Sequence, residues 1–306
     1  MAMLPNPLPR LADDLSGAAL GLRLPPGRLV DTTFDGPWHE PLLWQADNPA
    51  APDSWRELLA ARTAGLLPVL LETGAIPGGE DVTGWELDPG MMSYPGDHDA
   101  EEFLAHAWPA AAENDDTSGA AVTEPLDGTP VPDPAAGTDD VPPNDATDDL
   151  VAPFGTDFPG LAPGLLDPAD AAAGLPDTVA AELTAELTRA RRLHDPRAAL
   201  VYARRSADIP AAIGWTGPIN HENDVALLCA VLRSWEDRFG LRVVALGFDT
   251  LTATVAVPPA TVEDAEAVAA EHLSFCPDNI TQNGPGTLRG YAKSLLDAQV
   301  WQFWWD

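Results

Sequence analysis

The fold is decided by one stretch of the sequence, which reads IGWTGPINHENDVALLCAVLRSWEDRFG (213–240), LRVVALGFDTLTATVAV (241–257) and PPATVEDAEAVAAEHLSFCPDN (258–279). Its first part repeats apolar residues at spacings of three and four, which is the pattern of one buried helical face. These apolar positions are Val225, Leu228, Cys229, Leu232, Trp235 and Phe239. Asn220 or Asn223 can cap the start of this helix, and Gly240 supplies its end.

Two strands and a second helix follow. Residues 251–257 are rich in β-branched side chains and alternate in polarity, which suits a half-buried strand. Residues 243–248 are its expected partner, and Asp249 with Thr250 suits a tight turn between them. Thr261 and Asp264 resemble a capping box at the start of the next helix. The expected inner face of that helix carries Ala265, Val268, Ala269, His272 and either Phe275 or Cys276.

The chain ends in VWQFWWD (300–306), and aromatic residues at this density predict a terminal strand buried in the sheet. A further strand at 199–204 and a short helix at 287–296 complete the order strand, helix, strand, strand, helix, helix, strand. This order predicts an α+β fold: a split βαββαβ-like C-terminal domain with helices packed on one face of a mixed sheet.

These motifs also carry a family resemblance. GWTGPINHEND, RSWEDRFG, GFDTL, AEHLSFCPDN and the closing WQFWWD together resemble the bacterial domain-of-unknown-function family 4253 from Leu200 to Asp306. The resemblance implies an actinobacterial-type intracellular protein. It brings a fold grouping and no catalytic residues, since that family has no established activity.

The rest of the chain divides into regions that differ in amino-acid composition. Residues 1–110 predict a small N-terminal α/β unit, in which strands at 41–45 and 66–71 flank a helix and form one right-handed parallel crossover. Pro68 in the second of these strands argues for a sheet edge or a strand start. Residues 111–153 are acidic and proline-rich and are expected to form a disordered linker or insertion. Residues 154–306 form the expected C-terminal domain, with its core at 197–306.

The formal net charge of −32 is concentrated in one region. All 16 lysine and arginine residues lie at or before Arg62 or at or after Arg189, while the residues between them hold 26 acids. A solvated acidic linker and an acidic decoy for a basic partner both explain this pattern. Nucleic-acid binding and docking on anionic membranes are disfavoured, because both use basic residues to neutralise phosphates.

No catalytic signature accompanies the fold pattern. The sequence has no phosphate-binding glycine loop, no G-x-S-x-G elbow, no H-E-x-x-H motif and no dinucleotide fingerprint. The cysteines, Cys229 and Cys276, fall on inner helix faces, which suits buried thiols in a reducing cytoplasm. No metal site or cofactor is expected. The chain also lacks a signal-peptide pattern at its start, so we expect a cytoplasmic protein.

Polar residues near the two helices are the candidates for a ligand or partner site: Trp215, Asn220, His221, Asn223, Asp224, His272, Asp278 and Asn279. His221 could act as a general base oriented by Asp224 or Asp278, or this segment could only cap its helix. His272 could be a ligand or a core histidine.

Two functions follow from these patterns. The first is a non-enzymatic protein-interaction module, for instance one that neutralises a basic partner or toxin, which the regional acidity and abundant tryptophan favour. The alternative is a small-molecule-binding protein or hydrolase with a cleft around Asn220, His221 and Asp278. Convergence of Asn220, His221, Asp224, His272 and Asp278 on one pocket would favour the alternative, and scatter would favour the interaction module.

Overall fold

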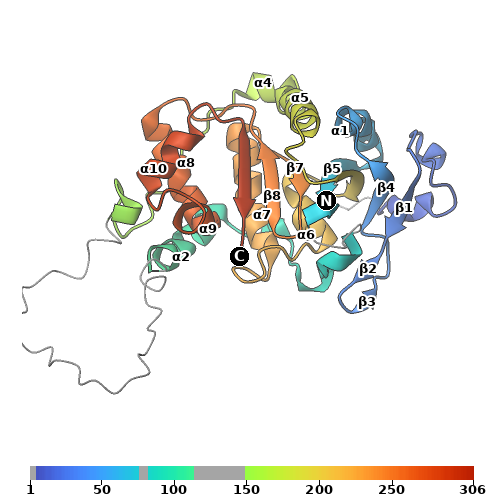
Figure 1. Cartoon of the computed structure of the whole chain (residues 1–306), viewed down its shortest axis with the longest axis horizontal. Coiled ribbons are helices and arrows are strands. Elements are labelled where there is room, and N and C mark those ends of the chain that lie inside the picture. The colour runs from blue at the N-terminus through green and yellow to red at the C-terminus, as the bar shows by residue number, and fades with distance from the viewer. Residues whose placement is uncertain (1–4, 76–81, 114–148) are drawn as a thin grey trace, which may run out of the picture.

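The computed structural model describes residues 5–75, 82–113 and 149–306. Their largest sheet has seven strands in the order β1-β4-β6-β5-β7-β8-β9 (Figure 1). The strands are β1 (Gly27–Val30), β4 (Leu43–Pro49), β5 (Leu66–Glu72), β6 (Pro196–Tyr202), β7 (Arg242–Leu246), β8 (Thr250–Thr254) and β9 (Val300–Trp304). A separate ribbon pairs β2 (Thr32–Thr33) with β3 (Gly36–Pro37). Every neighbouring pair in the large sheet is antiparallel except β5 and β7.

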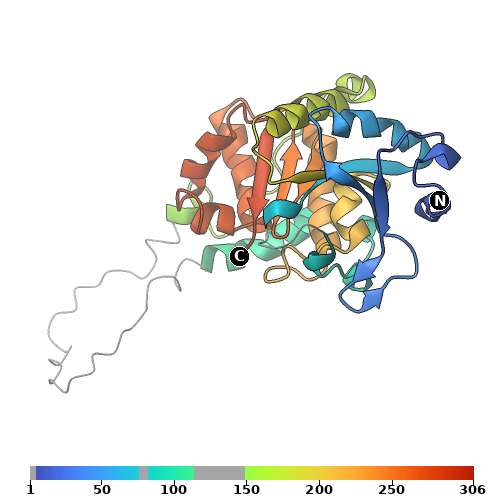
Figure 2. The ribbon, with the colours of Figure 1, turned by 45° about the vertical axis from the view of Figure 1, so that its right-hand side comes forward.

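Helices cover both faces of this sheet (Figures 1 and 2). One face packs against α2 (Ala100–Glu113), α6 (Ile209–Ile213), α7 (Val225–Phe239), α8 (Val262–Phe275) and α10 (Leu288–Leu295). The other packs against α1 (Ser54–Leu58) and α5 (Leu175–Arg189). Two further short helices are α4 (Pro168–Ala172) and α9 (Asp278–Thr281).

The α+β class and the mixed sheet predicted from the sequence are confirmed. The helices α6, α7, α8 and α10 pack on one face, as predicted, but α5 packs on the other. Helix α5 belongs to the predicted C-terminal domain, yet it buries Ala180 and Ala181 on the face opposite α7 and α8. The physical reason lies in the strands. All residues of β5 are buried, and so are the last four of β7, so both faces of these strands must be shielded from water.

The sheet also crosses the predicted boundaries between regions. β5, from the predicted N-terminal unit, lies between β6 and β7, which the split βαββαβ order treats as parts of one domain. β4 and β5 both run antiparallel to β6 and are therefore parallel to each other, as the crossover prediction required, with β6 between them. Residues 114–148, most of the predicted acidic linker at 111–153, lie outside the described residues.

Pro68 sits in the interior of the sheet rather than at the predicted edge or strand start. It is the third residue of β5, opposite Leu200 of β6. The ladder from β5 to β7 includes only Leu70 and Leu71. Around Pro68 the strand therefore pairs with one neighbour, which lets the sheet accept a residue that has no backbone N–H.

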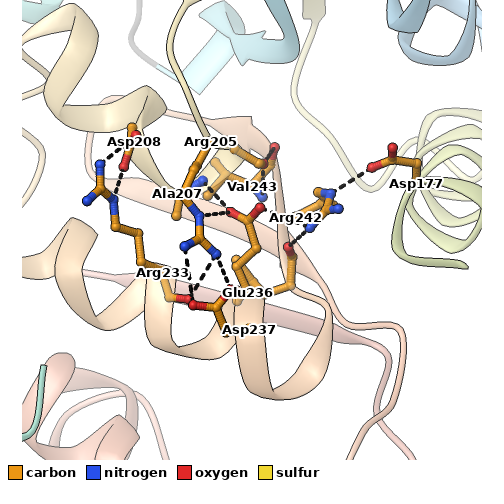
Figure 3. A network of polar contacts seen from close by, with 11 residues as sticks. Asp177, Arg205, Ala207, Asp208, Arg233, Glu236, Asp237, Arg242 and Val243 are labelled. Carbon is orange, nitrogen blue, oxygen red and sulfur yellow. Dashed lines mark hydrogen bonds and ion pairs between the residues drawn. The ribbon is translucent and has the colours of Figure 1, made fainter. Parts of the chain in front are cut away.

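A network of ion pairs joins α5, α7, β7 and the segment before α6 (Figure 3), and Arg62 extends it to the N-terminal part of the chain. Asp177 on α5 accepts a hydrogen bond from Arg62 and another, of 2.7 Å, from Nε of Arg242 on β7. Arg242 lies 3.3 Å from a carboxylate oxygen of Glu236 on α7, and Arg205 lies 3.7 Å from the other. The network therefore links η3 (Leu59–Ala64), which precedes residues 111–153, to α5, α7 and β7, which follow them.

Within the described residues, the structure contains no helix that is both long enough and apolar enough to span a bilayer.

Candidate functional site

Trp215 and Asp224, two of the predicted site residues, hold the local fold together. Trp215 is 1% exposed, and its indole Nε1 donates to the carbonyl oxygens of Gly247 and Phe248 at 2.9 and 3.2 Å. Asp224 caps α7, because its Oδ1 accepts from the backbone N–H of Ala226 at 3.1 Å. The sequence had suggested Asn220 or Asn223 as this cap. That assignment is wrong, since Asp224 directly precedes the first helical residue.

Asn220 and Asp278 hydrogen-bond to the last residue of the chain, and the charge of Asp278 also acts on His221. Asn220 Nδ2 donates to the backbone carbonyl of Asp306 at 3.0 Å, and the backbone N–H of Asp306 donates to Asp278 Oδ2 at 3.1 Å. The pKa of His221 lies below its usual value because protein atoms displace water from the ring, although the side chain is exposed. The negative charges of Asp278 and Glu222 oppose that shift. Asn220 and Asp278 therefore hold the chain end in place.

His272 lies in a closed aromatic core. Its ring is fully buried, with centroids 4.6 Å from Trp301, 4.9 Å from Trp235 and 4.9 Å from Phe303. Nδ1 lies 3.1 Å from the hydroxyl of Tyr291, while Nε2 finds no hydrogen-bond partner among the described residues. Burial lowers the pKa of His272 to about 3. The ring is therefore neutral at pH 7 and packs as an aromatic side chain, which was one of the two predicted roles.

Asn279 ties α9 to the terminal strand. Its Oδ1 accepts from the backbone N–H of Trp304 at 3.1 Å, and its Nδ2 donates to the carbonyl oxygen of Gln302 at 2.6 Å. The neighbouring Cys276 is buried and donates to the carbonyl oxygen of Trp304 at 3.0 Å. Burial raises the pKa of this thiol, as it does for Cys229, so neither cysteine is a ready nucleophile.

The predicted residues thus do not converge on one pocket. Asn220 and Asp278 hydrogen-bond to Asp306, His221 is exposed next to Asn220, Asp224 caps a helix, and His272 lies in the aromatic core. Asn223 is exposed at the start of α7. No group of three or more histidine, cysteine, aspartate or glutamate residues in the described part of the chain could hold a metal ion.

A cavity of about 590 Å³ opens beside the chain end, and only Asn220 of the predicted residues lines it. We call it the acidic cavity. Its lining residues are Phe34, Glu86, Asp88, Met91, Thr216, Gly217, Ile219, Asn220, Phe248, Asp249, Trp305 and Asp306. They come from the turn between β2 and β3, the segment around the short 3-10 helix η6 (Pro89–Met91), the loop after α6, the turn between β7 and β8, and the end of β9.

Hydrogen bonds between these segments fix the cavity walls. The backbone N–H of Phe34 donates to the carbonyl oxygen of Leu87 at 3.0 Å, and the Thr216 hydroxyl donates to that of Trp85 at 2.9 Å. On the opposite side, Nε1 of Trp304 donates to Asp249 Oδ2 at 3.1 Å. The walls are therefore built from both the N-terminal and the C-terminal parts of the chain.

Two glycines of the G-W-T-G run are required by close packing at this cavity. Gly214 adopts a φ of +69°, and a Cβ there would overlap the backbone nitrogen of Pro89. A Cβ at Gly217 would overlap the indole ring of Trp215. This close approach lets the backbone N–H of Asp88 donate to the Gly214 carbonyl oxygen at 2.7 Å, which brings η6 against the loop after α6.

The acidic cavity combines negative charge with exposed apolar surface. Four acidic side chains line it and no lysine or arginine does: Glu86, Asp88, Asp249 and Asp306. Seven large hydrophobic side chains are exposed among the described residues, and four of them line this cavity: Phe34 (66%), Ile219 (48%), Met91 (41%) and Phe248 (41%). Glu86 has a φ of +55°, which is uncommon for a residue with a side chain and often marks functional segments.

The sequence reasoning missed the aromatic residues of this site, although a signal for them exists. Phe34 precedes Asp35-Gly36, and Phe248 precedes Asp249-Thr250, so both phenylalanines lie in turns between short strands. Turns stay at the surface because their backbone groups need water or local partners. An aromatic residue at a turn is therefore a candidate for exposure and binding.

Residues 197–306 match the model of a family described as Domain of unknown function (DUF4253), which confirms the resemblance seen in the C-terminal motifs. No curated protein and no solved structure matches the chain. The matched region contributes the loop after α6, the turn between β7 and β8, and the chain end to the acidic cavity. Phe34, Glu86, Asp88 and Met91 come from outside it.

Proposed function

We propose that this chain is a non-enzymatic protein-interaction module that binds a basic segment of a protein partner in the acidic cavity. The observation that carries the proposal is the coincidence of four acidic and four exposed large apolar side chains around one concavity. Exposed apolar surface of this kind marks interaction sites in soluble proteins. The surrounding acidic groups select a partner with the opposite charge.

The two kinds of side chain play different parts in the proposed binding. Burial of Phe34 and Phe248 against a partner supplies affinity, because aromatic anchors in concave sites dominate interface energies. The carboxylates and the net charge of −32 attract a cationic partner over a distance and orient it. Binding should therefore weaken as salt is added, while the apolar contribution remains.

The partner chemistry follows from this arrangement. A lysine or arginine side chain can lay its aliphatic stem on the phenylalanine rings and direct its charged end to Glu86 or Asp249. An adjacent apolar residue of the partner can then pack against Ile219. The partner is accordingly a protein with an exposed segment in which basic and apolar residues alternate, and a basic toxin that must be neutralised is one example.

The alternative is binding or hydrolysis of a small molecule around Asn220, His221 and Asp278. It has weaker support, because Asn220 and Asp278 are hydrogen-bonded to Asp306 and the other predicted residues lie elsewhere. We also place the protein in the cytoplasm. That placement rests on the two free, buried cysteines, which a reducing compartment would preserve.

Peptides of defined composition test the proposal by calorimetry. One peptide alternates arginine with tryptophan, a second replaces tryptophan with glycine, and a third replaces arginine with glutamine. We expect the first to bind most tightly and to lose affinity as salt is raised. Phe34→Ala should weaken that binding by at least about tenfold.

Val262→Ala is the matched control, since Val262 is 59% exposed and lies outside the cavity. It should leave the affinity unchanged. Equal loss in the two variants, or equal binding of all three peptides, would contradict the proposal.

A further inference from the structure

A second cavity, of about 290 Å³, lies on the other side of η6 from the acidic cavity. Met91 of this segment faces the acidic cavity, whereas Pro89 and Met92 line the second one. The remaining walls come from the end of β6 with the two residues after it, from η9 (Ser206–Asp208), from α6 and from residues 93–95. Most of these lining residues are apolar, and the volume is near the lower end of the range for small-ligand sites.

The second cavity, which we call the Arg204 cavity, contains one cationic side chain without an acidic partner. Arg204 is exposed, and its Nη1 donates to the hydroxyl of Tyr94 at 3.0 Å. No aspartate or glutamate among the described residues forms an ion pair with it. The next residue, Arg205, differs, because its Nη2 lies 2.5 Å from Asp237 (Figure 3).

The acidic residue at this cavity is already neutralised. Asp208 receives two hydrogen bonds from Arg233, at 2.5 Å from Nε and 2.9 Å from Nη2 (Figure 3). This paired geometry uses both carboxylate oxygens. The charge left over at the cavity is therefore the positive charge of Arg204, in a protein whose net charge is −32.

Tyr94 completes the polar end of the cavity. The guanidinium carbons of Arg233 and Arg204 lie 5.2 and 5.7 Å from the centre of its ring, so the ring is held against both cations. Its hydroxyl oxygen accepts from Arg204, while the hydroxyl hydrogen has no acceptor within the described residues. Arg204 and Tyr94 thus present two donors that can reach the two oxygens of one carboxylate.

We infer that the Arg204 cavity binds a small organic acid, whose carboxylate pairs with Arg204 and Tyr94 and whose apolar body packs against Pro89, Met92, Ala211 and Ala212. This inference does not depend on the proposed partner binding, because the two cavities have opposite charge and share no lining residue.

Phenylacetate is a suitable probe, with phenylacetamide as its neutral counterpart and inorganic phosphate as an anion without an apolar body. Calorimetry or NMR titration of the full chain should give a dissociation constant for phenylacetate of roughly 0.1–5 mM. Phenylacetamide and phosphate should each bind at least about tenfold more weakly. Equal binding of phosphate or of phenylacetamide would overturn the inference, as would the absence of phenylacetate binding.

Variants locate the site. Arg204→Gln should weaken phenylacetate binding by at least about tenfold, and Tyr94→Phe by roughly threefold to tenfold, because each removes a hydrogen bond to the carboxylate. Arg189→Gln is the matched control, since Arg189 is exposed on α5 and lies away from the cavity. Unchanged circular dichroism of the variants shows that they are folded. If Arg204→Gln binds phenylacetate as tightly as Arg189→Gln does, the assigned site is wrong.

Discussion

The aromatic core and the acidic cavity meet at the end of β9, and they differ in how far their aromatic side chains are exposed to solvent. In the core, His272, Trp301, Phe303 and Trp305 are at most 2% exposed. In the cavity, the aromatic side chains of Phe34 and Phe248 are 66% and 41% exposed. Most of the polar residues that the sequence marks as candidates hold the core and its edges in place. The exposed cavity residues come from turns, and they have fewer structural roles within the fold.

The largest expected effect is on the core side of this comparison. Truncation after Val300 removes Trp301, Phe303 and Trp305, all of them buried. Loss of one buried aromatic side chain costs about 3–5 kcal/mol, and total stability is about 5–15 kcal/mol, so the C-terminal part should unfold. Near-UV circular dichroism checks this. A soluble truncated protein with a native-like spectrum would show that the core does not depend on β9.

A smaller loss of stability is expected when the buried ion pair between Glu271 and Arg238 is broken. Glu271 is fully buried and accepts hydrogen bonds from Arg238 at 2.8 and 2.6 Å and from the Trp235 indole at 2.8 Å. Glu271→Ala leaves the guanidinium of Arg238 without its partner and should lower the free energy of unfolding by about 3–5 kcal/mol.

The surface pair Arg289–Glu266 provides the control. Arg289 is 60% exposed, so Glu266→Ala should cost less than about 1 kcal/mol in urea unfolding. Similar losses in Glu271→Ala and Glu266→Ala would mean that burial of the first pair contributes little.

Acid should weaken the core through His272. Its folded-state pKa of about 3 lies below the unfolded value of about 6.5, so the unfolded chain takes up a proton that the folded chain excludes. The stability contribution is complete above pH ~6.5 and is lost as the pH falls towards 3, by up to about 1.4 kcal/mol per pH unit.

His272→Phe should remove this contribution to the pH dependence of the free energy of unfolding. Urea unfolding from pH 7 to pH 4 measures that dependence as a slope. His106→Gln, which changes an exposed residue on α2, should keep the slope. If the slope is the same in His272→Phe and in the wild type, His272 does not remain neutral in the core.

The smallest expected change in the free energy of unfolding distinguishes Asp224, which caps α7, from Asn223, which the sequence suggested as the cap. Asp224→Ala should lower the free energy of unfolding by about 0.5–2 kcal/mol, because the N–H groups of Ala226 and Ser93 lose their acceptor. Asn223→Ala, at the neighbouring exposed position, should change it by less than about 0.5 kcal/mol. Reversal of this order in urea unfolding would restore Asn223 as the cap.

Local patterns in the sequence were enough to predict the elements of the core. The apolar spacing from Val225 to Phe239 identifies α7 and its buried face, and the terminal aromatic residues identify β9. Thr261 caps α8 as expected, with its hydroxyl accepting from the N–H of Asp264 at 3.1 Å. These features depend on residues that are close together in the chain, so a single sequence is enough to predict them.

Non-local features could not be predicted in the same way. The position of β5 between β6 and β7 depends on pairing with strands more than a hundred residues away, for which a single sequence has no signal. The packing of α5 is also non-local. Ala180, Ala181 and Ala185 are among its buried residues, because small side chains let the helix approach the sheet.

In the proposed function, binding of a basic partner depends on the charge and shape of the acidic cavity itself. It does not depend on the net negative charge of the whole chain. Glu86→Lys and Glu182→Lys both reduce the net negative charge by the same amount, but only Glu86 lines the cavity, while Glu182 is exposed on α5. The deciding measurement is the affinity of each variant for the arginine–tryptophan peptide at physiological salt. We predict a loss of at least about tenfold for Glu86→Lys and less than about twofold for Glu182→Lys. Equal affinities of the two variants would contradict the account.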